Sequence, residues 1–364
     1  MRKRTALLSV YSKAGIVEFA RELVRLGWDI LASGGTAKVL QEAKVPVRDV
    51  AELVGKPILK HRVVTLSREV HAGLLATTTQ IDLEELESLG IPFIDLVCVD
   101  LYPLAEEIFR FGSTCESVIE KTDIGGPTML RSAAKGRRIV IVDPGDRTYV
   151  LAWLQNGEPD RELFIMALAA KAEYVVAGYC LASAKYHGGG TYDGVLGTRV
   201  RTCAYGENAW QTPAALYSTG GSDPLALDKF TLARGADPSF NNLVDLDRLL
   251  QSISHIGAAF ILRNGAVPYI AVGAKHGNPC GAAISSHEKH DAIRDMVMGD
   301  PRAILGGLVI MNFALDEGDV ELLLTYRHAE GRRRFDGVIV PAVTPAALAA
   351  LKRKGDKCRV FVNP

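Results

Sequence analysis

The chain has 364 residues, 48% of them hydrophobic, with 42 Lys plus Arg and 42 Asp plus Glu. This length predicts two domains, and the zero formal net charge gives no basic field that would attract nucleic acid. No apolar run has the length of a membrane span, the N-terminus lacks a signal-peptide core, and the six cysteines form no CxxC pair. We therefore expect a soluble cytoplasmic α/β protein that binds neither nucleic acid nor membrane.

The first half of the chain alternates strand patterns with helical patterns. Apolar residues at helical spacing predict helices over 16–26 and 38–43. Continuous apolar runs predict strands over 6–10, 28–32, 94–99 and 138–142. Strand–helix units with short crossovers are typical of a parallel sheet covered by helices on both faces. In such a fold, ligands bind at the carboxyl ends of the strands.

Polar residues follow three of these strands. Lys13 follows the first, 33–36 the second and Tyr102 the third. The backbone amides and hydroxyl groups of Ser33, Gly34, Gly35 and Thr36 at a helix start form a pattern that cradles phosphate. Lys13 is then either a phosphate partner or a solvated loop lysine.

The segment over 123–135 is a further candidate ligand-binding element. Gly125 and Gly126 allow the backbone to approach a ligand closely, and Pro127 suits the first turn of the helix that follows. Asp123 and Lys135 stand at the two ends of this segment and are placed to frame one small ligand. The alternative is an ordinary loop followed by a buried helix. Asp123 is expected on the same rim as Lys13 and Tyr102.

The second half of the chain predicts a separate domain. We expect a helical connection over 149–190, followed by strands over 214–217, 270–274, 307–311 and 337–341. Lys275 and His276 stand at the end of one of these strands, where an acid or base is placed to act, and a turn is expected to follow. Cys280 lacks the second cysteine and the His-x-Glu of a deaminase zinc loop, so no metal site is predicted.

Seven segments in this order resemble one family. The resemblance is to the bifunctional purine-biosynthesis proteins that join aminoimidazole-carboxamide ribotide (AICAR) transformylase to inosine monophosphate (IMP) cyclohydrolase. The matching segments are 9–15, 33–37, 62–66, 123–135, 205–208, 240–243 and 275–281.

The resemblance implies a fold and a pair of reactions. It implies a methylglyoxal-synthase-like domain over 1–148 that closes the purine ring of formyl-AICAR without a cofactor. It also implies a partial cytidine-deaminase-like transformylase domain over 191–364 that would use 10-formyltetrahydrofolate. Members of the family form homodimers, so a homodimer acting on a purine ribotide is expected.

The matched motifs also imply residue roles. Tyr102, Asp123 and Lys135 would perform ring closure, and Lys275 and His276 would serve the second domain. Substrate-binding roles fall on Ser12, Lys13, Ser33, Gly34, Gly35, Thr36, Arg62, Thr65, Gly125, Gly126, Thr128, Tyr205 and Asn242.

Departures from the family pattern occur in both domains. Val64 replaces a lysine, Asp100 an asparagine, and Ala14 a residue with a hydroxyl group. Ala204 and Trp210 replace an arginine and a histidine. The sequence printed also stops at Pro364, before the rest of the transformylase domain, so folate-dependent formylation is expected to be lost.

Three functions fit this pattern. The first is closure of formyl-AICAR to IMP. The second is ring closure of an AICAR-like ribotide by a specialised paralogue in nucleoside biosynthesis. The third is nucleotide binding by a catalytically silent regulatory protein.

Overall fold

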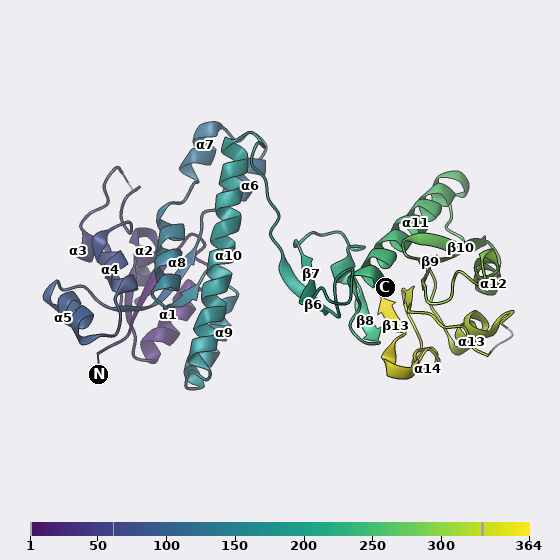
Figure 1. The fold of residues 1–364 in the computed structure, drawn as a ribbon. Coiled ribbons are helices and arrows are strands. Elements are labelled where there is room, and N and C mark those ends of the chain that lie inside the picture. Colours follow the sequence, from purple (N-terminus) through teal and green to yellow (C-terminus); the bar gives the residue numbers. More distant parts are fainter. Residues whose placement is uncertain (1, 61, 329–330) are drawn as a thin grey trace. The chain divides into compact units, whose positions relative to one another are not determined.

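A computed structural model describes residues 2–60, 62–328 and 331–364 (Figure 1). The chain divides into two compact units, Met1–Gly194 and Val195–Pro364. Each unit contains its own sheet and its own hydrophobic clusters.

The first unit is built on a five-stranded parallel sheet, as predicted. Its strand order is β3 (Arg48–Asp49), β2 (Asp29–Ala32), β1 (Thr5–Val10), β4 (Ile94–Asp100), β5 (Ile139–Ile141). From β1 the chain adds β2 and then β3 on one side, and it later adds β4 and then β5 on the other side. The strand order therefore reverses between β1 and β4, which is the topological switch point. Parallel sheets with this change of direction open a crevice at the carboxyl ends of the two central strands.

Side chains alternate between the two faces of β1. Ala6, Leu8 and Val10 join one buried cluster, whereas Leu7 joins the cluster on the opposite face. Because both faces are buried, the strand reads as a continuous apolar run. The helices of this unit are α1 (Ile16–Arg25), α2 (Gly34–Glu42), α3 (Ala51–Val54), α4 (Arg68–Leu75), α5 (Gln80–Ser88), α6 (Leu104–Phe109), α7 (Cys115–Glu120), α8 (Gly125–Lys135), α9 (Asp146–Gln155) and α10 (Arg161–His187).

The segment over 149–190, expected to connect two domains, is instead part of the first unit. Helix α10 contacts α8, β5 and α6, and its Ile165 and Ala172 enter the clusters on opposite faces of the sheet (Figure 1). The boundary between the units therefore follows Gly194. Helix α10 is long and apolar enough by length and composition to cross a membrane, a test that core helices of other proteins also pass.

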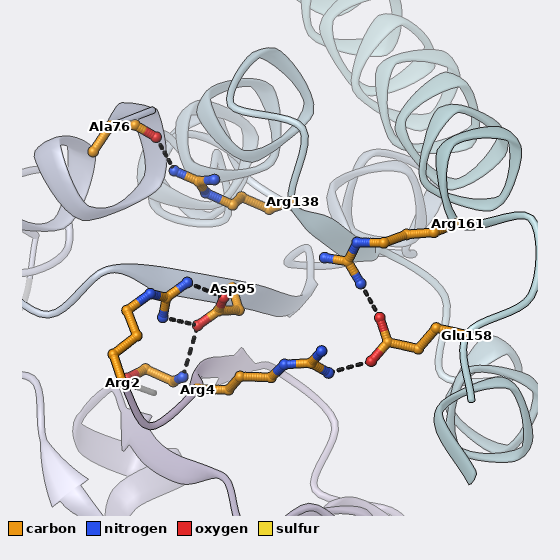
Figure 2. Close-up of polar contacts among 8 residues, drawn as sticks. Arg2, Arg4, Ala76, Asp95, Arg138, Glu158 and Arg161 are labelled. Atoms are coloured by element: carbon orange, nitrogen blue, oxygen red, sulfur yellow. Dashed lines mark hydrogen bonds and ion pairs between the residues drawn. The ribbon is translucent and has the colours of Figure 1, made fainter. Parts of the chain in front are cut away.

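A polar network closes the amino-terminal edge of the first sheet (Figure 2). Both terminal nitrogens of Arg2 donate to the Asp95 carboxylate, at 2.7 and 2.5 Å, and the Thr5 amide donates to the same carboxylate at 3.0 Å. The guanidinium carbons of Arg2 and Arg138 lie 4.0 and 3.8 Å from the centroid of the Phe93 ring. Arg138 also donates to the Ala76 carbonyl. This network lies at the edge opposite the carboxyl ends of the strands.

A second set of contacts at this edge ties β1 to α10. Glu158 pairs with Arg4, which precedes β1, and with Arg161, the first residue of α10 (Figure 2).

Asp95 is expected to be a stabilising residue. It is 8% exposed, so the Asp95→Ala change leaves a buried amide and a guanidinium without their acceptor, and we expect a loss of about 2 kcal/mol in the free energy of unfolding. Urea denaturation measures this loss in the free energy of unfolding. The control is Asp29→Ala, which removes the exposed partner of Lys3 and should leave stability almost unchanged. Equal effects of the two changes would contradict the assignment.

The second unit contains a six-stranded mixed sheet. Its order is β10 (Asn278–Ser285), β9 (Tyr269–Lys275), β11 (Leu308–Met311), β12 (Gly337–Val340), β13 (Arg359–Val362), β8 (Thr231–Arg234). A separate hairpin joins β6 (Thr198–Cys203) to β7 (Ala214–Ser218).

Helices cover both faces of the second sheet. The helix α11 (Phe240–Asn264) packs on one face. The opposite face is covered by α12 (Lys289–Gly299), α13 (Glu317–Thr325) and α14 (Pro345–Ala350). The remaining elements are the short 3₁₀ helices η1 (Leu227–Lys229) and η2 (Lys354–Asp356).

The turn expected after Lys275 and His276 is a two-residue hairpin loop. His276 and Gly277 both have positive φ, and Lys275 pairs with Asn278 across the hairpin. The residues from Asn278 onward therefore form strand β10, although Pro279 and Gly281 are typical of turns.

Candidate functional site

The first unit contains a cavity of about 980 Å³ at the carboxyl ends of β1, β2 and β4. It lies at the topological switch point, where a doubly wound sheet binds its ligand. The sequence-predicted residues that line it are Lys13, Ser33, Gly34, Gly35, Thr36, Arg62, Thr65, Tyr102, Asp123, Gly125 and Gly126.

One side of the cavity has the features of a phosphate site. Helix α2 begins at Gly34, four residues earlier than predicted, so Gly34, Gly35 and Thr36 form its first turn. The Ser33 hydroxyl lies 2.8 Å from that of Ser9. Amides at a helix N-terminus that are not used within the helix attract anions.

Lys13 is held against the same turn. Its ammonium group donates to the Val10 carbonyl and lies 3.3 Å from the Thr36 hydroxyl oxygen. Burial lowers the pKa of Lys13, and the negative charge of Asp100 opposes that shift. The side chain is thus positioned beside the first turn of α2.

Asp100 changes the electrostatics of the neighbouring loop. Its two carboxylate oxygens accept hydrogen bonds from the backbone amides of Tyr11 and Ser12, at 2.5 and 3.0 Å. These amides directly follow β1, and Tyr11 and Asp100 both line the cavity, whereas Ser12 does not. The carboxylate therefore uses donors that would otherwise be available to an anionic ligand.

Asp123 is fixed in place by the start of α8. Its carboxylate accepts the Gly126 amide at 2.9 Å, and a Cβ atom at Gly126 would lie 2.4 Å from the other carboxylate oxygen. Only glycine therefore allows this approach. Burial raises the pKa of Asp123, and backbone amides, first that of Gly126, limit the shift. Asp123 is consequently a stronger base than an exposed aspartate.

Helix α10 braces the loop that carries Asp123. The Asp123 amide donates to the Tyr179 hydroxyl oxygen at 2.6 Å, and that hydroxyl donates to the Lys121 carbonyl at 3.0 Å. Burial raises the pKa of Tyr179 to about 12, so its phenol stays protonated as this bridge requires. Sequence analysis did not single out Tyr179.

An aromatic and cationic group lies beside Asp123. The rings of Tyr11 and Tyr102 meet edge to face, with centroids 5.4 Å apart. The Lys121 ammonium lies 4.9 Å from the Tyr11 centroid and 5.9 Å from the Tyr102 centroid. Burial, and then the charge of Asp123, raises the pKa of Tyr102. Tyr102 therefore remains a hydrogen-bond donor near neutral pH.

The remaining wall contains Arg62, Val64 and Thr65. Arg62 pairs with Glu120 at 3.0 Å, and the Thr65 hydroxyl oxygen lies 2.9 Å from where a Cβ of Gly125 would stand. Val64, where the family has lysine, lines the cavity with an apolar side chain. Lys121 supplies a cation to the same cavity.

Three predicted residues of the first unit do not line the cavity. Lys135 ends α8, whose 11 residues span about 16 Å, and its side chain is exposed. Ser12 contributes its amide to Asp100, and the Thr128 hydroxyl donates to the Ile124 carbonyl at 2.7 Å. The expectation that Asp123 and Lys135 frame one ligand is therefore not supported by this geometry.

The second-unit residues have structural contacts. Lys275 donates to the Leu305 carbonyl at 2.7 Å, and His276 occupies the hairpin loop. Asn242 forms a capping box with Ser239 at the start of α11, and the Tyr205 carbonyl accepts the Phe240 amide at 3.0 Å. None of the four predicted residues, Tyr205, Asn242, Lys275 and His276, lines the cavity of the first unit.

Sequence reasoning missed Tyr11, Lys121 and His187, which line the cavity. Lys121 stands two residues before Asp123, and this closeness to a predicted catalytic residue was the available signal. His187 ends α10, which sequence analysis assigned to a connection.

Comparison with known proteins gives two family matches. Residues 133–364 match the AICARFT/IMPCHase bienzyme family, and residues 15–128 match the MGS-like domain. The bifunctional purine biosynthesis protein PurH of Deinococcus deserti is 37% identical over 380 residues, covering 100% of this chain and 69% of that protein. PurH of Brucella ovis is 36% identical, covering 97% of this chain and 64% of that protein.

A solved structure, "Crystal structure of ForH", shares 37% sequence identity at a TM-score of 0.46, covering 52% of this chain and 99% of that one. The chain spans about two thirds of the length of the two PurH relatives it matches. The resemblance carried by the ordered motifs is thus confirmed, and the chain belongs to the AICARFT/IMPCHase bienzyme family, with an MGS-like domain before its second unit.

Proposed function

We propose that the first unit closes the purine ring of formyl-AICAR to give IMP. The observation that carries this proposal is one cavity lined by a half-buried carboxylate, Asp123, a phenol, Tyr102, and a cation, Lys121, together with a helix start suited to phosphate. The family and the relatives support a role in purine biosynthesis.

The phosphate of the ribotide would bind at the start of α2. Gly34 and Gly35 offer backbone amides, and Lys13 adds a positive charge beside them. Binding there would direct the base of the ligand toward the Asp123 side of the same cavity. Positioning the two reacting groups within one molecule removes much of the entropic cost of ring closure.

The ring closes when the carboxamide nitrogen bonds to the formyl carbon. Asp123 would accept the proton that the nitrogen loses, and its raised pKa suits it to that task. The formyl oxygen gains negative charge and takes up two protons, one returned from Asp123 and one lost by the formamide nitrogen as its C–N double bond forms, and it then leaves as water. Tyr102 and Lys121 are the donors near Asp123 that would stabilise this oxygen. The reaction needs no cofactor or metal.

Lys121 would replace the lysine that the family has at the position of Val64. Both residues line the same cavity, and only Lys121 carries charge. The stabilising cation would thus reach the site from the loop before Asp123 instead of from position 64.

We infer that this chain alone does not formylate AICAR from 10-formyltetrahydrofolate. Ala204 stands where the family has a phosphate-binding arginine, and losing such a charge-assisted contact weakens binding strongly. Asn242 is used as a helix cap, and Lys275 donates to a backbone carbonyl. The homodimeric state and the cytoplasmic location remain predictions from the family resemblance.

A second candidate substrate is favoured by Asp100. A carboxylate that occupies the Tyr11 and Ser12 amides disfavours a second negative charge nearby. This arrangement, together with apolar Val64, fits a paralogue that closes the ring of an AICAR-like ribotide with a different base or a different phosphate position.

Titration of the full chain with IMP in a calorimeter tests whether the first unit binds the nucleotide product. One IMP per chain is expected, and no binding up to about 1 mM IMP would contradict the proposal.

The same titration tests Asp100. The Asp100→Asn change removes a negative charge and should tighten IMP binding about tenfold, because the ligand phosphate no longer faces a carboxylate. Inosine, which lacks the phosphate, is the matched control and should bind both forms equally. Tightening for inosine as well would show that Asp100 acts on the base or ribose instead.

A further inference from the structure

The second unit contains a cavity of about 640 Å³ with an unusual charge. Among the residues that the structure describes, seven that line it are Arg or Lys and none is Asp or Glu. The chain as a whole has no net charge, so this concentration of one sign is local. The cavity belongs entirely to the second unit and has no residue in common with the cavity of the first.

Strand register brings the basic residues together. Arg332, Arg333 and Arg334 precede β12, and 352–357 precedes β13. These strands are parallel neighbours, with Gly337 opposite Arg359. Segments that lead into parallel neighbouring strands reach the sheet at the same edge. Two basic segments about 20 residues apart in sequence therefore face one cavity.

The described part of the chain neutralises few of these charges. Arg332 pairs with Glu321, and Arg353 pairs with Asp336 at 2.7 Å. Among the described residues, no ion pair or side-chain hydrogen bond involves the exposed groups of Arg334, Lys352, Lys354 and Lys357. Like charges held close together repel one another, so this edge is electrostatically unfavourable without an anion.

Arg333 adds a buried charge to the same wall. It is 2% exposed, and its terminal nitrogens donate to the carbonyls of Leu323 and Tyr326 at 2.9 and 3.0 Å. Its Nε has no partner among the described residues, and no carboxylate pairs with its guanidinium group. Burial lowers the pKa of Arg333. A buried cation balanced only by carbonyl groups is costly, and an anion in the cavity would offset that cost.

We propose that this cavity binds a small molecule that carries a chain of phosphates, such as a nucleoside triphosphate. Its volume is in the range of small-molecule sites, and Arg and Lys are the side chains that bind phosphate best. Four unpaired cations match the charge of an oligophosphate better than that of a single phosphate group. The site is independent of ring closure in the first unit.

Calorimetry of the full chain with inorganic tripolyphosphate tests the proposal. Tripolyphosphate should bind at least about tenfold more tightly than inorganic phosphate, because it engages more of the cations. ATP and AMP distinguish the sources of the phosphates. If ATP binds as tightly as tripolyphosphate and AMP binds more weakly, the site accepts a nucleoside attached to the phosphates. If only tripolyphosphate binds tightly, the site takes a free oligophosphate. Either result supports the proposal.

The double variant Lys352→Ala/Lys354→Ala should weaken tripolyphosphate binding at least about tenfold. The matched control, Arg199→Ala/Arg263→Ala, removes two positive charges from exposed positions of the second unit outside the cavity. It should change the affinity for tripolyphosphate less than about twofold. Circular dichroism checks that both variants fold.

Three outcomes would overturn the proposal. They are no binding of tripolyphosphate up to about 5 mM, equal weakening in the two double variants, and binding of single-stranded RNA about a hundredfold tighter than tripolyphosphate. The last outcome would assign the basic edge to nucleic acid.

Discussion

Asp123→Asn is expected to lower kcat for ring closure of formyl-AICAR by about 10²- to 10⁴-fold, with a much smaller effect on KM. Asparagine keeps the shape of the side chain and can still accept the Gly126 amide, which the carboxylate accepts at 2.9 Å. It cannot take a proton from the carboxamide nitrogen. Steady-state kinetics measured by IMP absorbance, with circular dichroism as the check on folding, provide the test.

The pH dependence of the unmodified protein gives a second readout of Asp123. Burial raises the pKa of this carboxyl group, and the reaction needs its ionised form. Activity should therefore fall as the pH drops through that raised pKa, at a higher pH than an exposed aspartate would give. In the Asp123→Asn variant, the residual rate should no longer show this fall at low pH. An unchanged rate and an unchanged limb in the variant would remove Asp123 from the mechanism.

Lys121→Met is expected to lower kcat about 100-fold, because it removes the cation beside Tyr102 while keeping an unbranched side chain of similar length. The matched control is Lys135→Met, which removes an exposed lysine that does not line the cavity and should change kcat less than about twofold. The same assay of IMP formation measures both.

Placing a lysine at position 64, where the family has one, sharpens this test. Val64→Lys in the Lys121→Met background places a cation in the same cavity and should recover part of the lost rate. The reverse pattern, in which Lys135→Met is inactive and Lys121→Met is fully active, would return the catalytic role to Lys135 as the family resemblance implies.

The sheet of the first unit could be predicted because its strands are buried on both faces. A strand such as β4, with six of its seven residues buried, reads as an apolar run that polar neighbours interrupt at its ends. The parallel arrangement then follows from the short crossovers, and the arrangement places the loops after β1, β2 and β4 at one edge. Most of the predicted phosphate-binding residues follow from this reasoning.

Other features depend on three-dimensional contacts that the sequence pattern does not contain. Helix α10 is apolar on most of its surface, so its sequence has no single apolar stripe that would mark a buried face. The burial of Ile165 and Ala172 in the core of the first unit could therefore not be predicted. The strand β10 contains Pro279 and Gly281, which suggest a turn, whereas the turn itself is the His276–Gly277 pair. The place of Lys121 depends on the course of the 121–124 loop, which Tyr179 fixes from a distant helix.

The measurement that most directly tests the central claim is the conversion of formyl-AICAR to IMP by the purified chain. We expect a rate well above the uncatalysed one, lowered by about 10²- to 10⁴-fold in Asp123→Asn and unaffected by omitting 10-formyltetrahydrofolate. IMP binding without turnover would contradict ring closure of formyl-AICAR, and would direct attention to AICAR-like ribotides and then to a regulatory role.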